Sequence, residues 1–226
     1  MKNSQPTNIL LVRHGQTDWN LARRAQGHID IPLNDAGRWQ SERLASRLAS
    51  STIDAIYSSD LRRASETAAI LGQALNLTPN LDAAFRERNG GIFQGLTGEE
   101  LARRYPDAVR AFKKHGQTPP GGESNLDLAR RAAPALERLA DGHRGQTIIL
   151  VTHGGTLRVL IAYLLGLPVG KKAPFKVSGN TGLTIAEVGD TARYITLLND
   201  SCHLDDSLDR GQTTNTPAGD ADYTIG

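Results

Sequence analysis

Two histidines in this chain each stand one residue after an apolar run and directly before a glycine, at His14-Gly15 and His153-Gly154. A neutral imidazole can act as a nucleophile or a general base near neutral pH. The glycines beside each ring leave room for a ligand to approach the backbone. Arg13 adds a guanidinium group, whose planar fork binds phosphate or carboxylate oxygens through paired hydrogen bonds. An isolated Arg-His-Gly is more often a solvated strand end, but the recurrence of the design at His153 favours a site for an anionic substrate.

Two further charged residues are candidates for the same site. Arg62 lies in the first turn of the helix expected after another buried strand, so we expect it to project at the same edge of the sheet, whereas Arg63 is expected to be solvated. Two guanidinium groups that converge on one point form an oxyanion pocket. Glu87, within Arg86-Glu87-Arg88, has on its own the features of a surface charge.

The elements that must position these residues alternate along the chain. Apolar runs predict strands at 9–12, 53–57 and 146–152, and the sequence also indicates strands at 81–85, 175–177, 182–188 and 193–198. Helical spacing predicts helices from 35, over 61–75 and 97–105, from 107, from 124 and over 156–165. This alternation is typical of an α/β fold with a mainly parallel sheet covered on both faces. Ligands bind outside the carboxyl ends of such strands, where His14 and His153 are expected to meet.

Local signals set several of these boundaries. Ser58-Ser59-Asp60 offers helix N-cap side chains, and Thr97 with Glu100 has the spacing of a capping box. Ser124 and Asp127 begin the next long helix, in which Pro134 should cause a kink or a division.

Composition excludes several classes of protein. The 226 residues are 38% apolar and 22% charged with a net charge of +2, which suits one packed domain and not a nucleic-acid binder. The N-terminus is too polar for a signal peptide, no apolar run is long enough to span a membrane, and the single Cys202 excludes an intrachain disulfide. We therefore expect a cytoplasmic protein with no nucleic-acid or membrane partner. A single domain is predicted over 1–204, followed by a polar, disordered tail over 205–226.

Four separated motifs together resemble the histidine phosphatase superfamily, which includes the cofactor-dependent phosphoglycerate mutases. They are Arg13-His14-Gly15, the segment from Ser58 to Ala68, Glu87, and Thr152-His153-Gly154-Gly155, and they occur in the order expected for that family. The resemblance covers roughly residues 8 to 204. It implies a three-layer α/β/α sandwich of the phosphoglycerate mutase-like type and a covalent phosphohistidine mechanism.

The resemblance also assigns roles to individual residues. His14 corresponds to the nucleophile, and Glu87 to the proton donor that later activates water. Arg13, Arg62 and His153 correspond to the groups that hold the phosphoryl oxygens. Further pocket positions are Asn20, Gln26, Gly27 and Gly154. Cationic side chains would neutralise the transferring phosphoryl group, so neither a metal nor a cofactor is expected.

Departures from the subfamilies bear on the reaction. The mutases carry a tyrosine at the position of Gly90, a lysine at that of Gly98 and an arginine pair where this chain has Lys113-Lys114. The ending Cys202-His203-Leu204 is similar to that of metal-independent phosphoserine phosphatases, but these have a histidine at the position of Gly90. Position 90 therefore argues against both sharply defined specificities.

These features predict a metal-independent phosphomonoesterase, a hydrolase of the histidine acid phosphatase type, acting on a small phosphorylated metabolite. Two alternatives stay open: a cofactor-dependent phosphoglycerate mutase, and a catalytically silent phospho-ligand binder on the same fold. The natural substrate and the formation of a homo-oligomer are left undecided by the sequence.

Overall fold

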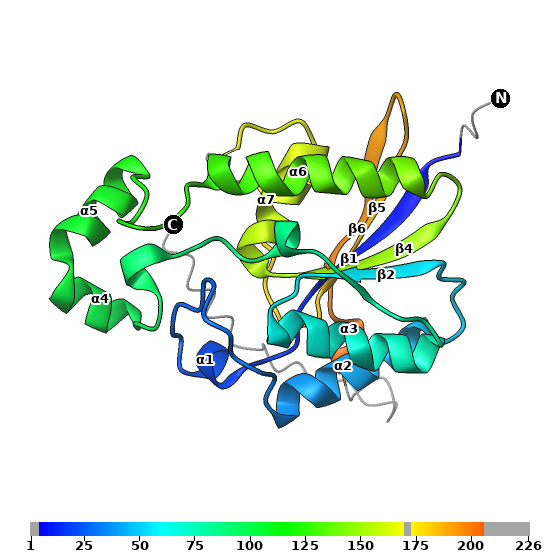
Figure 1. Cartoon of the computed structure of the whole chain (residues 1–226), viewed down its shortest axis with the longest axis horizontal. Coiled ribbons are helices and arrows are strands. Elements are labelled where there is room, and N and C mark those ends of the chain that lie inside the picture. The colour runs from blue at the N-terminus through cyan, green and yellow to red at the C-terminus, as the bar shows by residue number, and fades with distance from the viewer. Residues whose placement is uncertain (1–4, 170–172, 206–226) are drawn as a thin grey trace.

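The computed structural model describes residues 5–169 and 173–205. They are organised around one six-stranded sheet with the strand order β3-β2-β4-β1-β5-β6 (Figure 1). The strands are β1 (Thr7–Arg13), β2 (Ala55–Ser58), β3 (Asn80–Leu81), β4 (Thr147–Thr152), β5 (Leu183–Val188) and β6 (Arg193–Asp200). β3, β2, β4 and β1 are parallel, whereas β5 is antiparallel to both of its neighbours, β1 and the edge strand β6. The predicted α/β fold with a mainly parallel central sheet is confirmed.

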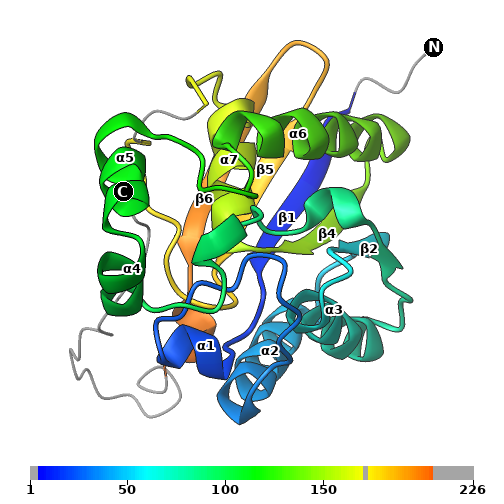
Figure 2. The same ribbon diagram turned by 60° about the vertical axis from the view of Figure 1, so that its left-hand side comes forward.

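Helices cover both faces of this sheet. α2 (Asp35–Leu48) and α3 (Arg62–Leu75) pack on one face, and α6 (Asn125–Gly142) and α7 (Gly154–Leu164) pack on the other (Figure 1). The short helices α1 (Asp18–Leu21), α4 (Gly98–Arg104) and α5 (Pro106–His115) lie beyond the edge at which β1 ends, as the turned view in Figure 2 also shows. Three short 3₁₀ turns complete the elements: Ala83–Phe85, Gly91–Phe93 and Cys202–Leu204.

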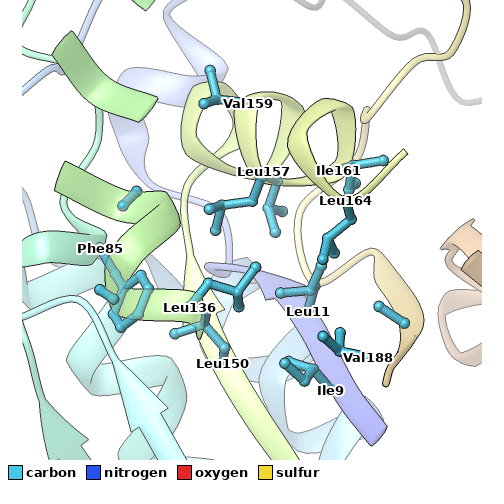
Figure 3. Packing of buried hydrophobic residues seen from close by; sticks show 14 of the residues in the cluster. Ile9, Leu11, Phe85, Leu136, Leu150, Leu157, Val159, Ile161, Leu164 and Val188 are labelled. Atoms are coloured by element: carbon cyan, nitrogen blue, oxygen red, sulfur yellow. The ribbon is translucent and has the colours of Figure 1, made fainter. Parts of the chain in front are cut away.

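The central strands are buried on both faces because their side chains alternate between two apolar cores. Ile9 and Leu11 of β1 join the cluster under α6 and α7, shown in Figure 3, while Leu10 and Val12 join the cluster under α2 and α3. β4 alternates in the same way. This explains why the runs before the two histidines are continuously apolar. Packing on both faces also holds the ends of β1 and β4 in place.

Four local expectations are corrected. The segment 81–85 is a strand only at Leu81, because the Asp82 side chain accepts a hydrogen bond from the Ala84 N–H and starts a 3₁₀ turn. Phe175–Val177 forms no strand with any of the described residues, although both end residues pack on the core. Of the two effects expected of Pro134, a kink or a division, the division does not occur, because α6 runs through this residue as one helix. Pro134 is exposed, so the carbonyl one turn earlier faces solvent.

The fourth correction concerns the start of α3. Its N-cap residue, Leu61, makes no side-chain cap, and Ser58-Ser59-Asp60 does not supply one at that position. Instead Asp30, from the loop after α1, accepts a hydrogen bond from the Arg62 N–H at 2.7 Å. The predicted capping boxes at Thr97 with Glu100 and at Ser124 with Asp127 are both present.

Within the described residues, no helix combines the length and the apolar character needed to cross a bilayer. The predicted C-terminal tail lies outside the described residues, except for Asp205.

Candidate active site

His14 and His153 lie side by side because their strands are neighbours in register. Arg13, the last residue of β1, is paired with Thr152, the last residue of β4, so each histidine is the first residue beyond its strand. The two ring centroids are 5.1 Å apart. The sequence prediction that the two motifs meet at one edge of the sheet is therefore confirmed.

The hydrogen bond of His14 identifies which ring nitrogen is able to react. Its Nδ1 lies 2.7 Å from the carbonyl oxygen of Gly15. A carbonyl oxygen only accepts hydrogen bonds, so Nδ1 carries the proton. In the neutral ring the lone pair is then on Nε2, and this nitrogen is the nucleophilic atom.

His14 is held in the neutral form by its surroundings. Burial lowers the pKa of His14 well below 6.5, and the nearby positive charges of Arg63 and Arg13 lower it further. The Gly15 carbonyl opposes this shift. The imidazole lone pair is therefore available at neutral pH, without a separate base to remove a proton.

The second guanidinium of the site belongs to Arg63, not to Arg62, and this corrects the prediction. Arg63 is completely buried and borders the pocket beside His14. It donates hydrogen bonds to the carbonyls of Gly27 and Ile29 at 2.8 and 3.0 Å. The Arg62 side chain is 58% exposed and pairs with Glu66 one turn along α3.

Helix geometry explains the difference between these neighbours. Consecutive residues on a helix point about 100° apart, so only one of them can face the sheet. Arg63 shares its side of α3 with Thr67 and Leu71, at intervals of four residues, and both are buried. The apolar stripe of α3 was therefore a usable signal for Arg63.

Arg63 remains positively charged despite its burial. Desolvation lowers its pKa to about 10, partly offset by the negative charges of Glu87 and Asp30. A pKa of about 10 leaves the guanidinium protonated at neutral pH. The pocket therefore has a buried cation, the Arg63 guanidinium, next to His14.

His153 lies behind Arg63 and is fully buried. Its Nδ1 is 3.1 Å from the Arg63 Nε, which can only donate, so Nδ1 must be the acceptor. Its Nε2 then carries the proton and donates to Ser59 Oγ at 2.8 Å. Both ring nitrogens are occupied, so a direct contact with a phosphoryl oxygen, as the resemblance implies, requires the ring to release one of these partners.

Glu87 lies on a loop that borders the pocket. This loop is held in place by α6 and by the segment that follows α1. Arg131 of α6 donates to the Glu87 carbonyl at 2.7 Å, and the His28 ring lies 2.7 Å from the same oxygen. The Glu87 carboxylate reaches the first turn of α7, where it accepts the Gly155 N–H at 2.9 Å. Arg131 was not among the residues singled out from the sequence, because nothing in its own helix marks it.

The pocket has a volume of about 250 Å³. The predicted positions Asn20, Gln26, Gly27 and Gly154 all border it, together with Arg13, His14 and Glu87. Gly15 does not serve ligand access: a Cβ there would lie 2.4 Å from the Gly37 carbonyl oxygen, so the missing side chain allows α2 to pack against the loop.

Four further arginines border the pocket and were not predicted from the sequence: Arg23, Arg24, Arg88 and Arg158. Arg88 and Arg158 both border the pocket, and Arg88 lies 5.1 Å over the Phe112 ring. Burial and the positive charge of Arg158 lower the pKa of Arg88. Arg158 stands four residues after Gly154 on α7, so helical spacing from the His153 motif was the signal that could have identified it.

Residues 5–169 and 173–205 contain no group of three His, Cys, Asp or Glu side chains placed to hold a metal ion.

Two proteins of Arabidopsis thaliana are similar to this chain over most of its length. It is 40% identical over 205 residues to phosphoglycerate mutase-like protein 4 of Arabidopsis thaliana, covering 88% of this chain and 87% of that protein. It is 41% identical over 162 residues to a metal-independent phosphoserine phosphatase of the same plant, covering 70% and 68% respectively.

A solved structure supports the same relationship. A mycobacterial glucosyl-3-phosphoglycerate phosphatase in complex with VO3 superposes with a TM-score of 0.77 at 33% identity, covering 85% of this chain and 98% of that one. The family model for the histidine phosphatase superfamily, branch 1, matches residues 9–201, which include every predicted catalytic position. With this match and the two relatives above, the chain belongs to the histidine phosphatase superfamily.

Proposed function

We propose that this chain is a phosphomonoesterase that hydrolyses a small phosphorylated metabolite through a phosphohistidine at His14, without a metal or a cofactor. The observation that carries the proposal is the state of His14: a neutral ring with its free lone pair on Nε2, beside Arg13 and Arg63. A nucleophile beside two cations suits an anionic electrophile.

The first half-reaction transfers the phosphoryl group to the enzyme. The Nε2 lone pair of His14 forms a bond to phosphorus while the ester oxygen departs with the bonding electrons. The cycle begins with Glu87 protonated. Glu87, which also borders the pocket, gives this proton to that oxygen, so the product leaves as a neutral alcohol. Arg13 and Arg63 neutralise the charge on the transferring oxygens.

The second half-reaction restores the enzyme. A water molecule attacks phosphorus, the P–N bond breaks, and the Glu87 carboxylate takes the water's proton. Inorganic phosphate is released and His14 is neutral again. Dividing the reaction in this way replaces one difficult step by two easier ones, since uncatalysed phosphate-monoester hydrolysis is among the slowest biological reactions.

His153 has a supporting place in this scheme. Its bond to the Arg63 Nε fixes the guanidinium plane, and its pKa is lowered by burial and then by Arg63, so the ring stays neutral. A neutral His153 adds no positive charge that would compete with the arginines for the phosphoryl oxygens.

The pocket wall indicates the class of substrate. Gly90 adds no side chain, and a Cβ there would meet little besides the Gln94 side chain, at 3.1 Å from its Cγ. The volume beyond His14 is therefore available for varied alcohol groups. Arg88 and Arg158 add positive charge on this side, which agrees with relatives named for phosphoserine and glucosyl-3-phosphoglycerate.

Phosphoglycerate mutase activity is the competing function, because several relatives carry phosphoglycerate mutase names. The mutase side chains expected at positions 90 and 98 are glycines here. A phosphoglycerate would therefore be bound by fewer side chains than in the mutases between the two half-reactions. Water would then compete with it for the phosphohistidine.

The test is an assay of the purified chain against a panel of phosphorylated metabolites, with and without exhaustive chelation. We expect phosphate release from several panel members, unchanged by the chelator. Interconversion of 2- and 3-phosphoglycerate faster than phosphate release would establish the mutase, and binding without turnover would establish a silent binder. Loss of turnover on chelation, restored by a divalent ion, would overturn the metal-independent mechanism.

A further inference from the structure

The Glu87 carboxylate is held at both oxygens by backbone groups. The Gly155 N–H, in the first turn of α7, donates to Oε2 at 2.9 Å, and the Arg88 N–H donates to Oε1 at 2.7 Å. The Thr156 hydroxyl lies 3.5 Å from Oε1 and bonds the Arg86 carbonyl at 2.9 Å. These contacts place the carboxylate directly against the α-carbon of residue 155.

Only glycine leaves space for the carboxylate in that place. A Cβ on Gly155 would lie 2.4 Å from Glu87 Oε1 and 3.1 Å from its Cδ. Gly154, the preceding residue in the same turn, is different: a Cβ there would come no closer than 3.5 Å to the Arg13 side chain. An ordinary van der Waals contact begins at about that separation, so the steric demand falls on Gly155 alone.

We infer that Gly155 is a positioning residue for the reaction: its bare α-carbon and its N–H together fix where Glu87 delivers a proton. This inference rests on the proposed role of Glu87 as the proton donor. The second glycine of the His153-Gly154-Gly155 motif thus serves to place the Glu87 carboxylate and not to admit the substrate.

A Cβ at residue 155 changes the position of Glu87 and not the fold. The atoms that a Cβ would displace are the end of a flexible side chain, so the carboxylate can swing away without moving the backbone. Alanine also favours a helix more than glycine does. Gly155→Ala should therefore fold normally and bind phosphate normally, with a displaced Glu87.

A displaced proton donor has a characteristic kinetic signature. An alkoxide leaving group needs a proton as the ester bond breaks, whereas 4-nitrophenolate is a weak base and leaves without one. The value of kcat/KM reports the steps up to phosphohistidine formation, where Glu87 acts as an acid. A general structural defect lowers kcat/KM for both substrates by the same factor.

The experiment compares kcat/KM for glycerol 2-phosphate and for 4-nitrophenyl phosphate in the whole chain. The variants are Gly155→Ala, Gly154→Ala as the matched neighbour, and Glu87→Gln as the reference for lost proton donation. General acid catalysis contributes about 10²–10⁴-fold. We expect Gly155→Ala to lose at least about tenfold more on the alkyl phosphate than on the aryl phosphate, as Glu87→Gln does. Gly154→Ala should keep the wild-type ratio between the two substrates.

A double variant provides an independent check. Glu87→Asp shortens the side chain and withdraws the carboxylate from residue 155, so its cost should be smaller in the Gly155→Ala background than in the wild type. Additive costs, or equal losses on both substrates in Gly155→Ala while Glu87→Gln is selective, overturn this inference alone. Equal losses in Glu87→Gln itself overturn the proton-donor role, and the inference with it.

Discussion

Arg63 donates its Nε–H to Nδ1 of His153 at 3.1 Å, and this bond determines both the tautomer of His153 and the orientation of the Arg63 guanidinium. It forces the His153 proton onto Nε2, where Ser59 accepts it, and it fixes the plane of the guanidinium that borders the pocket. The basic residue of α3 that belongs to the site is therefore Arg63, which follows the predicted Arg62 by one position.

The neighbouring arginines give a matched test of this assignment. Arg63→Ala should lower kcat/KM by about 10²–10³-fold, the usual cost of removing one donor to the reacting oxygens. It should also destabilise the fold by about 1–3 kcal/mol, because the carbonyls of buried Gly27 and half-buried Ile29 lose their donors. Arg62→Ala should change neither quantity appreciably, since its side chain is exposed and forms a surface ion pair with Glu66. Equal effects of the two variants on kcat/KM, measured beside urea unfolding, would contradict the assignment.

The stability of the fold should depend on pH through its buried histidines. Burial lowers the pKa of His203 from 6.5 to about 4. Between these two values the unfolded chain binds the proton and the folded chain does not, so this stabilising contribution is present above pH 6.5 and is lost as the pH falls toward 4. One proton is worth about 1.4 kcal/mol per pH unit.

His203→Gln isolates that contribution. The variant keeps a polar group within reach of Thr181 Oγ1, which the His203 Nε2 contacts at 3.0 Å, but it does not titrate. Urea unfolding at pH 7 and pH 5 should show a smaller drop for the variant than for the wild-type chain. An identical drop in both would show that His203 takes up its proton equally in the folded and unfolded states.

Gly90 offers a test of substrate selection. Its backbone, at φ −81° and ψ −2°, suits any residue, and the neighbouring Gln94 side chain can give way. Gly90→Tyr and Gly90→His should therefore narrow the range of substrates more than they slow hydrolysis of those that still fit. One contact changes selectivity by roughly 1–3 kcal/mol. The measurement is kcat/KM over the metabolite panel, and a wild-type chain already confined to one substrate would refute the expectation.

Much of the site was predictable because strong local patterns determine it. The continuous apolar runs of β1 and β4 are buried on both faces, and burial in one parallel sheet brings His14 and His153 to the same edge. Periodicity and capping boxes likewise predicted α2, α4 and the start of α6.

The parts that could not be predicted depend on contacts between distant segments. Asp30 starts α3 in place of the serines next to it, and Arg131 of α6 holds the Glu87 loop by its carbonyl oxygens. Neither interaction leaves a mark in the local sequence. The choice between Arg62 and Arg63 was decidable from the buried stripe of α3, but the first-turn position alone did not decide it.

The central claim is that His14 carries the phosphoryl group, and trapping the intermediate tests it most directly. The whole chain is mixed with a ³²P-labelled phosphomonoester, quenched in alkali within the first turnover, digested and mapped by mass spectrometry. The account predicts an acid-labile phosphate on the His14 imidazole of the wild-type chain, and no label and no turnover in folded His14→Ala. Substantial turnover by His14→Ala, or label on another residue with none on His14, would contradict it.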